Sequence, residues 1–280
     1  MNSPIISAEQ LAAQIGQANL ILVDARNTPD PKSTFSKGHL QGARFVDPNE
    51  DLANIKENLA DGGRHPLPSV PDFCSVLGKL GITPESHVVI YDDQNGANSA
   101  ARMWWMLKAF GHQQVQVLEG GIQAGITAGI PVESGTDSNE EAPSYPGKAW
   151  ELGIASMEEV ERISKDKDYL LIDVRSPERY RGEQEPIDLV AGHIPGAINI
   201  PLNSNMDANG KFQAPEEIAK KYTEVFGERS NEHIIVHCGS GVSACHTLLA
   251  LDYAGLGIPK LYVGSWSEWS RNDKPIGKSV

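Results

Sequence analysis

The chain carries a degenerate internal duplication, and this feature constrains its fold more than any other. Five short motifs occur in the first half and recur in the second half. The paired segments are 7–10 and 156–159, 22–26 and 171–175, 38–43 and 192–197, 88–92 and 234–238, and 117–121 and 261–265. Because the matches keep one order along the chain, we expect two domains of the same fold.

Each half alternates short apolar strands with amphipathic helices, for example at residues 103–110 and 247–254. This alternation is typical of an α/β fold in which helices flank a mainly parallel sheet. Both halves begin with Ser-x-x-Gln/Glu, at 7–10 and 156–159, which is the capping box of a helix N-terminus. The sequence therefore predicts two tandem α/β domains, with functional groups at the carboxyl ends of the strands.

A stretch that is rich in turn formers and acidic residues separates the two repeats. We expect the linker at residues 135–147. The first domain then covers residues 1–134 and the second covers residues 148–280.

The 280-residue chain has a net charge of −13 and a pI near 5.0. This charge argues against a nucleic-acid backbone or an anionic membrane surface as a partner. No apolar run reaches the roughly 18 residues of a transmembrane helix, and the N-terminus lacks the basic and apolar regions of a signal peptide. We therefore expect a cytoplasmic protein.

The three cysteines, Cys74, Cys238 and Cys245, are too few and too scattered for a disulfide framework, and none belongs to a Cys-x-x-Cys zinc pattern. We expect neither a metal nor an organic cofactor. Cys238 stands out because an apolar, β-branched run at 234–236 precedes it and an apolar helical pattern begins at Ala244.

About six residues turn the chain between this strand and this helix, so their N–H groups are expected to point towards the sulfur of Cys238. Such a nest, with the positive end of a helix dipole behind it, stabilises an anion and favours a reactive thiolate. A buried packing cysteine is the alternative interpretation. In the first half, the loop at 92–99 begins with Asp92 instead. We expect that loop to be exposed and inactive, with ligand binding through its carboxylates as the alternative.

Together these residues resemble the rhodanese family, in particular its two-domain sulfurtransferases related to 3-mercaptopyruvate sulfurtransferase. The motifs that carry the resemblance are Asp-Val-Arg at 173–175, Arg-Tyr-Arg-Gly at 179–182, Gly-His-Ile-Pro-Gly at 192–196, Cys-Gly-Ser-Gly-Val-Ser-Ala at 238–244, and Gly-Ser-Trp-Ser-Glu-Trp at 264–269. The resemblance spans nearly the whole chain. It implies two tandem rhodanese-like domains, of which the first is inactive and the second catalytic.

The resemblance further implies that Cys238 takes a sulfane sulfur from a small donor, carries it as a persulfide, and passes it to a thiol or cyanide. The loop residues Gly239, Gly241, Val242 and Ser243 would hold the persulfide through their N–H groups. Glycine at 239 and 241 is expected to let the loop curl tightly. A thioredoxin-like reductant is one acceptor that this chemistry implies.

Three other readings of the loop stay open. A cysteine phosphatase is disfavoured, because the arginine of the Cys-x5-Arg phosphate-binding motif is replaced by Ala244. A persulfide carrier that serves protein partners would use the same loop. An unreactive structural duplicate would require an inert Cys238.

The loop at 239–241 carries no cationic side chain, which favours monoanionic 3-mercaptopyruvate over dianionic thiosulfate as the donor. Thiosulfate stays the alternative. The resemblance implies two arginines that hold the donor, and Arg179 matches the first. The position of the second, after a Glu-Pro pair, is occupied by Ile187. We expect Arg181 or Arg64 to replace it.

Ser240 matches a serine that the resemblance implies in a proton relay with a histidine from the first half. His65 lies where that histidine is expected. An acidic third member has no clear match, since Asn49 falls near its position and Asp47 or Glu50 would have to substitute. The alternative role for His65 is to order a loop between prolines.

The remaining prominent residues are interpreted as structural, because several of them recur in the half without a loop cysteine. They are the turn histidines His39 and His193, the strand-end pairs Asp24 with Arg26 and Asp173 with Arg175, the packing residue Cys245 about two turns into its helix, and the buried helix residues Trp104 and Trp105. We expect the inactive half to shape a cleft between the two halves. Trp266 and Trp269, which follow the last strand of the second half, are expected to wall that cleft.

Overall fold

The computed structural model describes residues 3–136 and 142–278 and divides the chain into two compact units. The first unit comprises the residues up to Asn54 and the segment Pro68–Glu151. The second comprises Ile55–Leu67 and the residues from Leu152 onward. The short segment Ile55–Leu67 lies within the first repeat of the sequence but packs with the second repeat. The second unit is therefore built from two separate segments of the chain.

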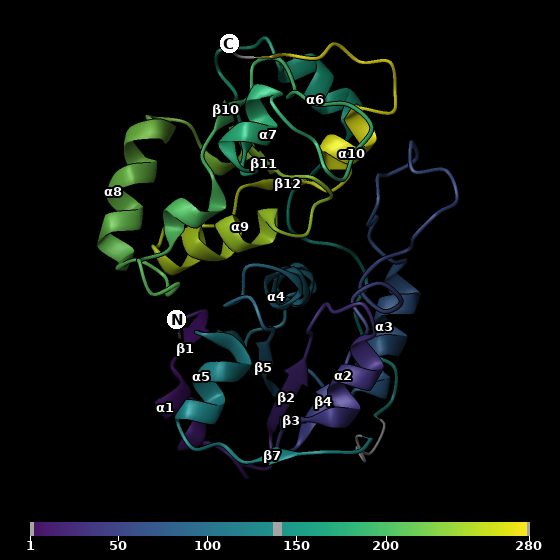
Figure 1. The fold of residues 1–280 in the computed structure, drawn as a ribbon, viewed down its shortest axis with the longest axis vertical. Helices are drawn as coiled ribbons and strands as arrows, with labels where there is room; N and C mark the ends of the chain where they lie inside the picture. The colour runs from purple at the N-terminus through teal and green to yellow at the C-terminus, as the bar shows by residue number, and fades with distance from the viewer. Residues whose placement is uncertain (1–2, 137–141, 279–280) are drawn as a thin grey trace. The chain divides into compact units, whose positions relative to one another are not determined.

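The first unit is built on a five-stranded parallel sheet (Figure 1). Its strands, in spatial order, are β1 (Ile5–Ile6), β6 (Val115–Leu118), β5 (His87–Tyr91), β2 (Leu20–Asp24) and β4 (Ala43–Phe45). Its helices are α1 (Ala8–Ala12), α2 (Pro31–Lys37), α3 (Val70–Lys79), α4 (Ser99–Ala109) and α5 (Gly121–Thr127). A small antiparallel pair joins β3 (His39–Leu40) to β7 (Val132–Glu133).

The second unit repeats the same order of strands, also all parallel (Figure 1). These strands are β8 (Ile154–Ala155), β12 (Lys260–Tyr262), β11 (Ile234–His237), β9 (Leu170–Asp173) and β10 (Ile198–Asn199). Its helices are α6 (Met157–Ile163), α7 (Pro177–Arg181), α8 (Pro215–Phe226), α9 (Ala244–Tyr253) and α10 (Ser265–Trp269), with 3₁₀ turns η1 (Leu202–Asn205) and η2 (Asn231–His233). The α/β fold class predicted from the duplication is confirmed.

The repeated serines begin helices as predicted, but only one of them forms a complete capping box. The hydroxyl of Ser7 accepts the N–H of Gln10, whose side chain accepts the N–H of Ser7 in return. Ser156 accepts the N–H of Glu159, but the Glu159 carboxylate pairs with Lys260 at 2.8 Å instead. The ion pair to β12 therefore replaces the second half of the box.

Successive side chains of a strand point to opposite faces of the sheet, so each sheet contributes apolar side chains to a layer on either face. In the first unit, Val89 and Tyr91 of β5 pack with α1, α2 and α5 residues in one cluster. In the second unit, Ile235 of β11 packs with Trp266 and Trp269 of α10. The expectation that these two tryptophans wall a cleft is wrong, because both are fully buried in this core.

Trp104 and Trp105 of α4 are fully buried, as predicted. Cys245 is also buried, and its thiol donates to the carbonyl of Gly241 at 3.4 Å, which supports a packing role. It lies in the first turn of α9 rather than two turns in, because the helix begins only at Ala244.

The duplicated turns form nearly the same hydrogen bonds in both units. Arg26 pairs with Asp24 at 2.6 Å and donates to the carbonyl of Gly38, and Arg175 pairs with Asp173 at 2.6 Å and donates to that of Gly192. His39 and His193 contact backbone carbonyls through Nδ1 and stack on Phe35 and Tyr180. The structural interpretation of these residues is confirmed.

Part of the expected linker packs on the first unit. The N–H of Ala142 donates to Gly78 and that of Tyr145 to Cys74, and Trp150 stacks on Phe73. Residues 137–141 of the expected linker lie outside the described residues. Among the residues that the structure describes, no helix is long and apolar enough to cross a membrane.

Candidate active site

Cys238 directly follows β11, the central strand of the second sheet, and its side chain is 1% exposed. Its N–H donates to the hydroxyl of Ser265 at 3.2 Å, and its carbonyl accepts from the N–H of Trp266 at 3.1 Å. The N–H of Ser267 donates to Gly239 at 2.8 Å. The beginning of α10 therefore holds the cysteine in place from the end of β12.

The two glycines of the loop are required for different reasons. Gly241 has φ of 73°, and a Cβ there would collide with the carbonyl of Val263, so this position needs the conformational freedom of glycine. Gly239 has no positive φ, and a Cβ there would lie 3.0 Å from Nη2 of Arg64. The expectation that Gly239 serves loop curvature is therefore wrong, because it makes room for guanidinium groups.

Four amides of the cysteine loop have no acceptor within the protein. Within residues 3–136 and 142–278, the N–H groups of Gly239, Ser240, Val242 and Ser243 donate to no protein atom. The helix α9 begins immediately after Ser243. Unpaired donors at the N-terminus of a ten-residue helix favour an anion beside Cys238.

His65 and Ser240 lie in direct contact. Nδ1 of His65 is 2.8 Å from the hydroxyl oxygen of Ser240, and Ser240 is 6% exposed. The segment Ile55–Leu67 places His65 there, because it belongs to the compact unit that contains the cysteine loop. Of the proposed acidic partners, Asp47 accepts the N–H groups of Asn49 and Glu50 in the other unit.

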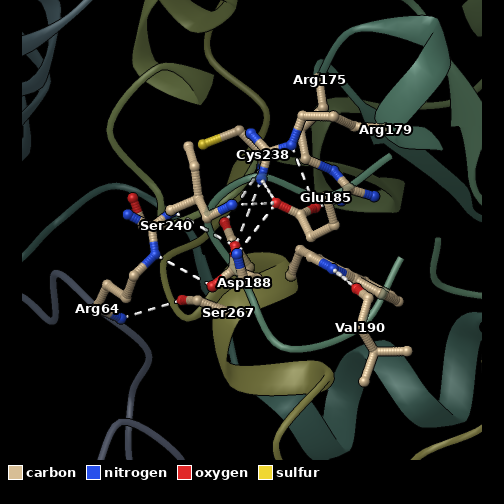
Figure 2. A network of polar contacts seen from close by, with 12 residues as sticks. Arg64, Arg175, Arg179, Glu185, Asp188, Val190, Cys238, Ser240 and Ser267 are labelled. Atoms are coloured by element: carbon tan, nitrogen blue, oxygen red, sulfur yellow. Dashed lines mark hydrogen bonds and ion pairs between the residues drawn. The ribbon is translucent and has the colours of Figure 1, made fainter. Parts of the chain in front are cut away.

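A buried carboxylate, Asp188, organises three arginines next to the loop, of which Arg64 and Arg179 are labelled in Figure 2. It pairs with Arg271 at 2.8 Å, with Arg64 at 3.1 Å and with Arg179 at 3.4 Å, and its side chain is fully buried. Glu185, also almost fully buried, pairs with Arg179 at 2.6 Å and with Arg175 at 3.2 Å. These carboxylates fix the direction of each guanidinium group.

The connected cluster carries a net positive charge. Four guanidinium groups face three carboxylates, since Asp173 pairs with Arg175 and completes the set. Burial opposes ionisation of Asp173, but the charge and hydrogen bonds of Arg175 help to hold its pKa below the ordinary value. Burial lowers the pKa of the neighbouring His237, so this imidazole is neutral and adds no charge at pH 7. One positive charge is therefore left in excess beside Cys238.

The two candidate replacements for the missing arginine differ. Arg181 is bound by Glu183 at 2.6 Å, and its side chain is 38% exposed at the end of α7. Arg64 instead lies against Gly239. Ile187 is half exposed, and its N–H donates to Glu185. The structure therefore brings Arg64, and not Arg181, to the cysteine loop.

Sequence reasoning missed the residues that support this site. They are Glu185, Asp188, Ser265, Ser267 and Arg271. A signal existed for part of them, because two acidic residues closely follow an arginine-rich helix and the motif at 264–269 was already recognised. In the described part of the chain, no group of three or more His, Cys, Asp or Glu side chains is arranged to hold a metal ion.

Comparison with known proteins agrees with this architecture. The model of the rhodanese-like domain matches residues 7–128 and 156–272. The chain belongs to the rhodanese family. Human 3-mercaptopyruvate sulfurtransferase is 34% identical over 96% of this chain and 91% of its own length. Thiosulfate sulfurtransferase of Gallus gallus is 33% identical over 94% and 90%.

A solved rhodanese-family structure supports the assignment. The 3-mercaptopyruvate sulfurtransferase of Escherichia coli superposes with a TM-score of 0.75 and 30% sequence identity, covering 95% of this chain and all of that chain. These two curated relatives, which match along nearly the whole chain, are sulfurtransferase enzymes. This rhodanese-family chain is therefore a sulfurtransferase, which needs a sulfur donor and an acceptor.

Proposed function

We propose that this rhodanese-family enzyme takes sulfur from 3-mercaptopyruvate and carries it as a persulfide on Cys238. One observation carries the proposal. Among the described residues, Cys238 and four loop amides without a protein acceptor lie beside Gly239, together with the guanidinium groups of Arg64 and Arg179 from a cluster with one excess positive charge. A small anion with a transferable sulfur is the ligand that this combination suits.

In the first half-reaction, the Cys238 thiolate attacks the thiol sulfur of the donor. An S–S bond forms and the C–S bond breaks, with its electron pair passing to the methylene carbon as the enolate of pyruvate. The proton of the donor thiol replaces the lost sulfur on that carbon. The products are pyruvate and the persulfide anion, whose outer sulfur the amides of the loop residues 239–243 stabilise.

The contact between His65 and Ser240 supports a proton relay in this step. The imidazole is within hydrogen-bond distance of the hydroxyl at 2.8 Å, and the hydroxyl belongs to the loop that surrounds the sulfur. A relay of this kind moves the proton from the donor thiol to the carbon as the C–S bond breaks. Cleavage without it would leave an unprotonated carbanion.

In the second half-reaction, a nucleophilic acceptor attacks the outer sulfur of the persulfide. The S–S bond breaks and its electron pair returns to Cys238 as the thiolate. Cyanide or a small thiol supplies the nucleophile, which the 1% exposure of Cys238 favours. Protein acceptors, namely a thioredoxin-like reductant or a persulfide relay between protein surfaces, stay the alternative.

The charge of the site favours 3-mercaptopyruvate over thiosulfate. The cluster has one excess positive charge and the Cys238 thiolate has one negative charge, so a dianion brings one more uncompensated negative charge into this buried site than a monoanionic carboxylate does. Thiosulfate stays the second candidate, because two guanidinium groups reach the loop. Its transfer would release sulfite and use no C–S cleavage.

Steady-state assays with both donors test the proposal. We expect kcat/KM for 3-mercaptopyruvate to exceed that for thiosulfate, and mass spectrometry to detect 32 Da added at Cys238 after donor treatment without acceptor. A thiosulfate kcat/KM well above that for 3-mercaptopyruvate would overturn the choice of donor. Absence of the persulfide with both donors would overturn the mechanism.

A further inference from the structure

Two guanidinium groups point at the backbone next to the nucleophile. A Cβ at Gly239 would lie 3.0 Å from Nη2 of Arg64 and 3.5 and 3.6 Å from Nη2 and Nη1 of Arg179. Both arginines therefore approach the same side of the residue that follows Cys238. They come from different parts of the chain, since Arg179 lies on α7 and Arg64 on the segment Ile55–Leu67.

Arg64 is held rigidly in this position. The side chain of Arg64 pairs with Asp188 through Nε at 3.1 Å, and the backbone N–H of Arg64 donates to the hydroxyl of Ser267 at 3.0 Å (Figure 2). Ser267 is fully buried and in turn donates to Gly264 at 3.0 Å. The guanidinium thus needs little reorganisation to meet a ligand.

Each of the two guanidinium groups keeps a donor free. Within residues 3–136 and 142–278, Nη1 of Arg64 and Nη1 of Arg179 contact no acceptor, although the other nitrogens of both groups contact Asp188 or Glu185. The Arg64 side chain is 21% exposed and that of Arg179 is 15% exposed. Both groups are therefore oriented by carboxylates and still able to donate to an incoming anion.

We propose that Arg64 is a substrate-binding residue, which together with Arg179 holds the carboxylate and keto oxygens of an α-keto acid donor. This proposal rests on the proposed function and names the second cation of the same site. The shared carboxylate of Asp188 couples the two guanidinium groups, so that they form one subsite. Position 187, where the second donor-binding arginine is expected, holds Ile187. Arg64 supplies the second guanidinium group from the segment Ile55–Leu67 instead.

Alkylation kinetics test the subsite without turnover of any sulfur donor. 3-Bromopyruvate and bromoacetone both alkylate a thiolate at a CH₂ next to a ketone, but only the first carries a carboxylate. The ratio of their rate constants at Cys238 therefore measures carboxylate binding, because changes in thiolate reactivity or access cancel. We expect Arg64→Gln to lower this ratio about tenfold, the effect of one lost charge-assisted hydrogen bond.

Arg181→Gln is the matched control, since it removes an arginine that Glu183 binds outside the cysteine loop. We expect it to leave the ratio unchanged. Arg64→Lys keeps a charge without the planar fork, and we expect a ratio between those of Arg64→Gln and the unaltered enzyme. Asp188 retains Arg179 and Arg271 in both Arg64 variants, which favours folding.

The outcomes separate this inference from the proposed function. An unchanged ratio in both Arg64 variants, with a lowered ratio in Arg179→Gln, would overturn the role of Arg64 and leave the proposed donor in place. A lowered ratio in Arg64→Gln, in an enzyme that does not turn over 3-mercaptopyruvate, would support the subsite and contradict the donor. Equal ratios for the enzyme and free N-acetylcysteine would overturn both.

Discussion

The loop after β5 and the loop after β11 occupy the same place in two copies of one fold, but they treat an anion in opposite ways. In the first unit the carboxylate of Asp92 is buried and accepts the N–H groups of residues 94, 96, 98 and 100 at 2.8 to 3.3 Å. In the second unit, four amides of the Cys238 loop have no acceptor among the described residues. The first loop binds its own carboxylate, whereas the second keeps N–H groups that its own side chains do not bind.

This comparison corrects the expectation that residues 92–99 form an exposed loop. Asp93 and Gln94 are exposed, but Asp92 itself is fully buried. A carboxylate at this position supplies the charge that a nest of amides binds, so the loop needs no ligand. The same strand, turn and helix therefore support a structural motif in one unit and a reactive site in the other, where the loop side chain and the surrounding arginines and His65 both differ.

The two units also differ at the turn that supports the loop. The N–H of Ile122 donates to the backbone carbonyl of Asp92 at 3.0 Å, as that of Trp266 donates to the backbone carbonyl of Cys238 at 3.1 Å. Gly121 has φ of 58°, and its counterpart Ser265 has φ of 53°. A non-glycine residue in this conformation is strained, and the Ser265 hydroxyl that accepts the Cys238 N–H accounts for its presence.

The largest expected effect concerns the residue that distinguishes the loops. Cys238→Ser should reduce sulfur transfer by about a thousandfold or more, because the hydroxyl is a poor nucleophile and forms no persulfide. Asp92→Cys in the same background should not restore transfer, since the arginine cluster and His65 belong to the second unit. Steady-state kinetics measure both, and restored transfer would contradict the division of roles between the units.

The relay is expected to have the next largest effect. His65→Asn and Ser240→Ala should each lower kcat for 3-mercaptopyruvate about 100-fold, the usual contribution of a positioned proton-transfer group. The double variant should lose little more, because the two residues act as one unit. Transfer from thiosulfate requires no protonation of carbon and is the internal control. An equal loss with both donors would assign His65 a structural role.

The closed nest of the first unit predicts a loss of stability. Asp92→Ala leaves four N–H groups without their acceptor, and we expect it to lower the free energy of unfolding by about 2 kcal/mol. The loss is less than the sum of four hydrogen bonds, because burial raises the pKa of Asp92 and so makes its charge costly. Urea denaturation measures the change, with exposed Asp93→Ala as the control. Equal stability of the two variants would contradict the closed nest.

The smallest expected effect concerns Ser265. Ser265→Gly relieves the strain but loses the hydrogen bond to Cys238, and Ser265→Ala loses the bond and keeps the strain. We therefore expect the alanine variant to be the less stable of the two by about 1 kcal/mol. Thermal denaturation measures the order of the pair. Greater stability of the alanine variant would show that the conformation at this turn carries no strain.

Much of this architecture could be predicted from local patterns. The duplicated motifs predicted two domains of the same fold. The apolar patterns before and after Cys238 predicted that it lies between a strand and a helix, which are β11 and α9. Local sequence also identified the Asp-Arg pairs and the turn histidines, because their partners lie within a few residues or recur in both halves. The role of Asp188 could not be predicted from local patterns, because its partners Arg64 and Arg271 are far apart in the chain.

The sequence by itself determined the family, the repeated α/β fold and the single sulfur-bearing loop, since these depend on periodicity and contiguous motifs. Only the tertiary structure decided between Arg181 and Arg64, because the choice depends on which guanidinium reaches Gly239. It also decided that Asp92 fills its own nest, since hydrogen-bond geometry cannot be read from residue types. The physical reason is that both outcomes depend on which side chains are buried together and where they point. These properties arise from contacts between distant parts of the chain, which a linear pattern does not encode.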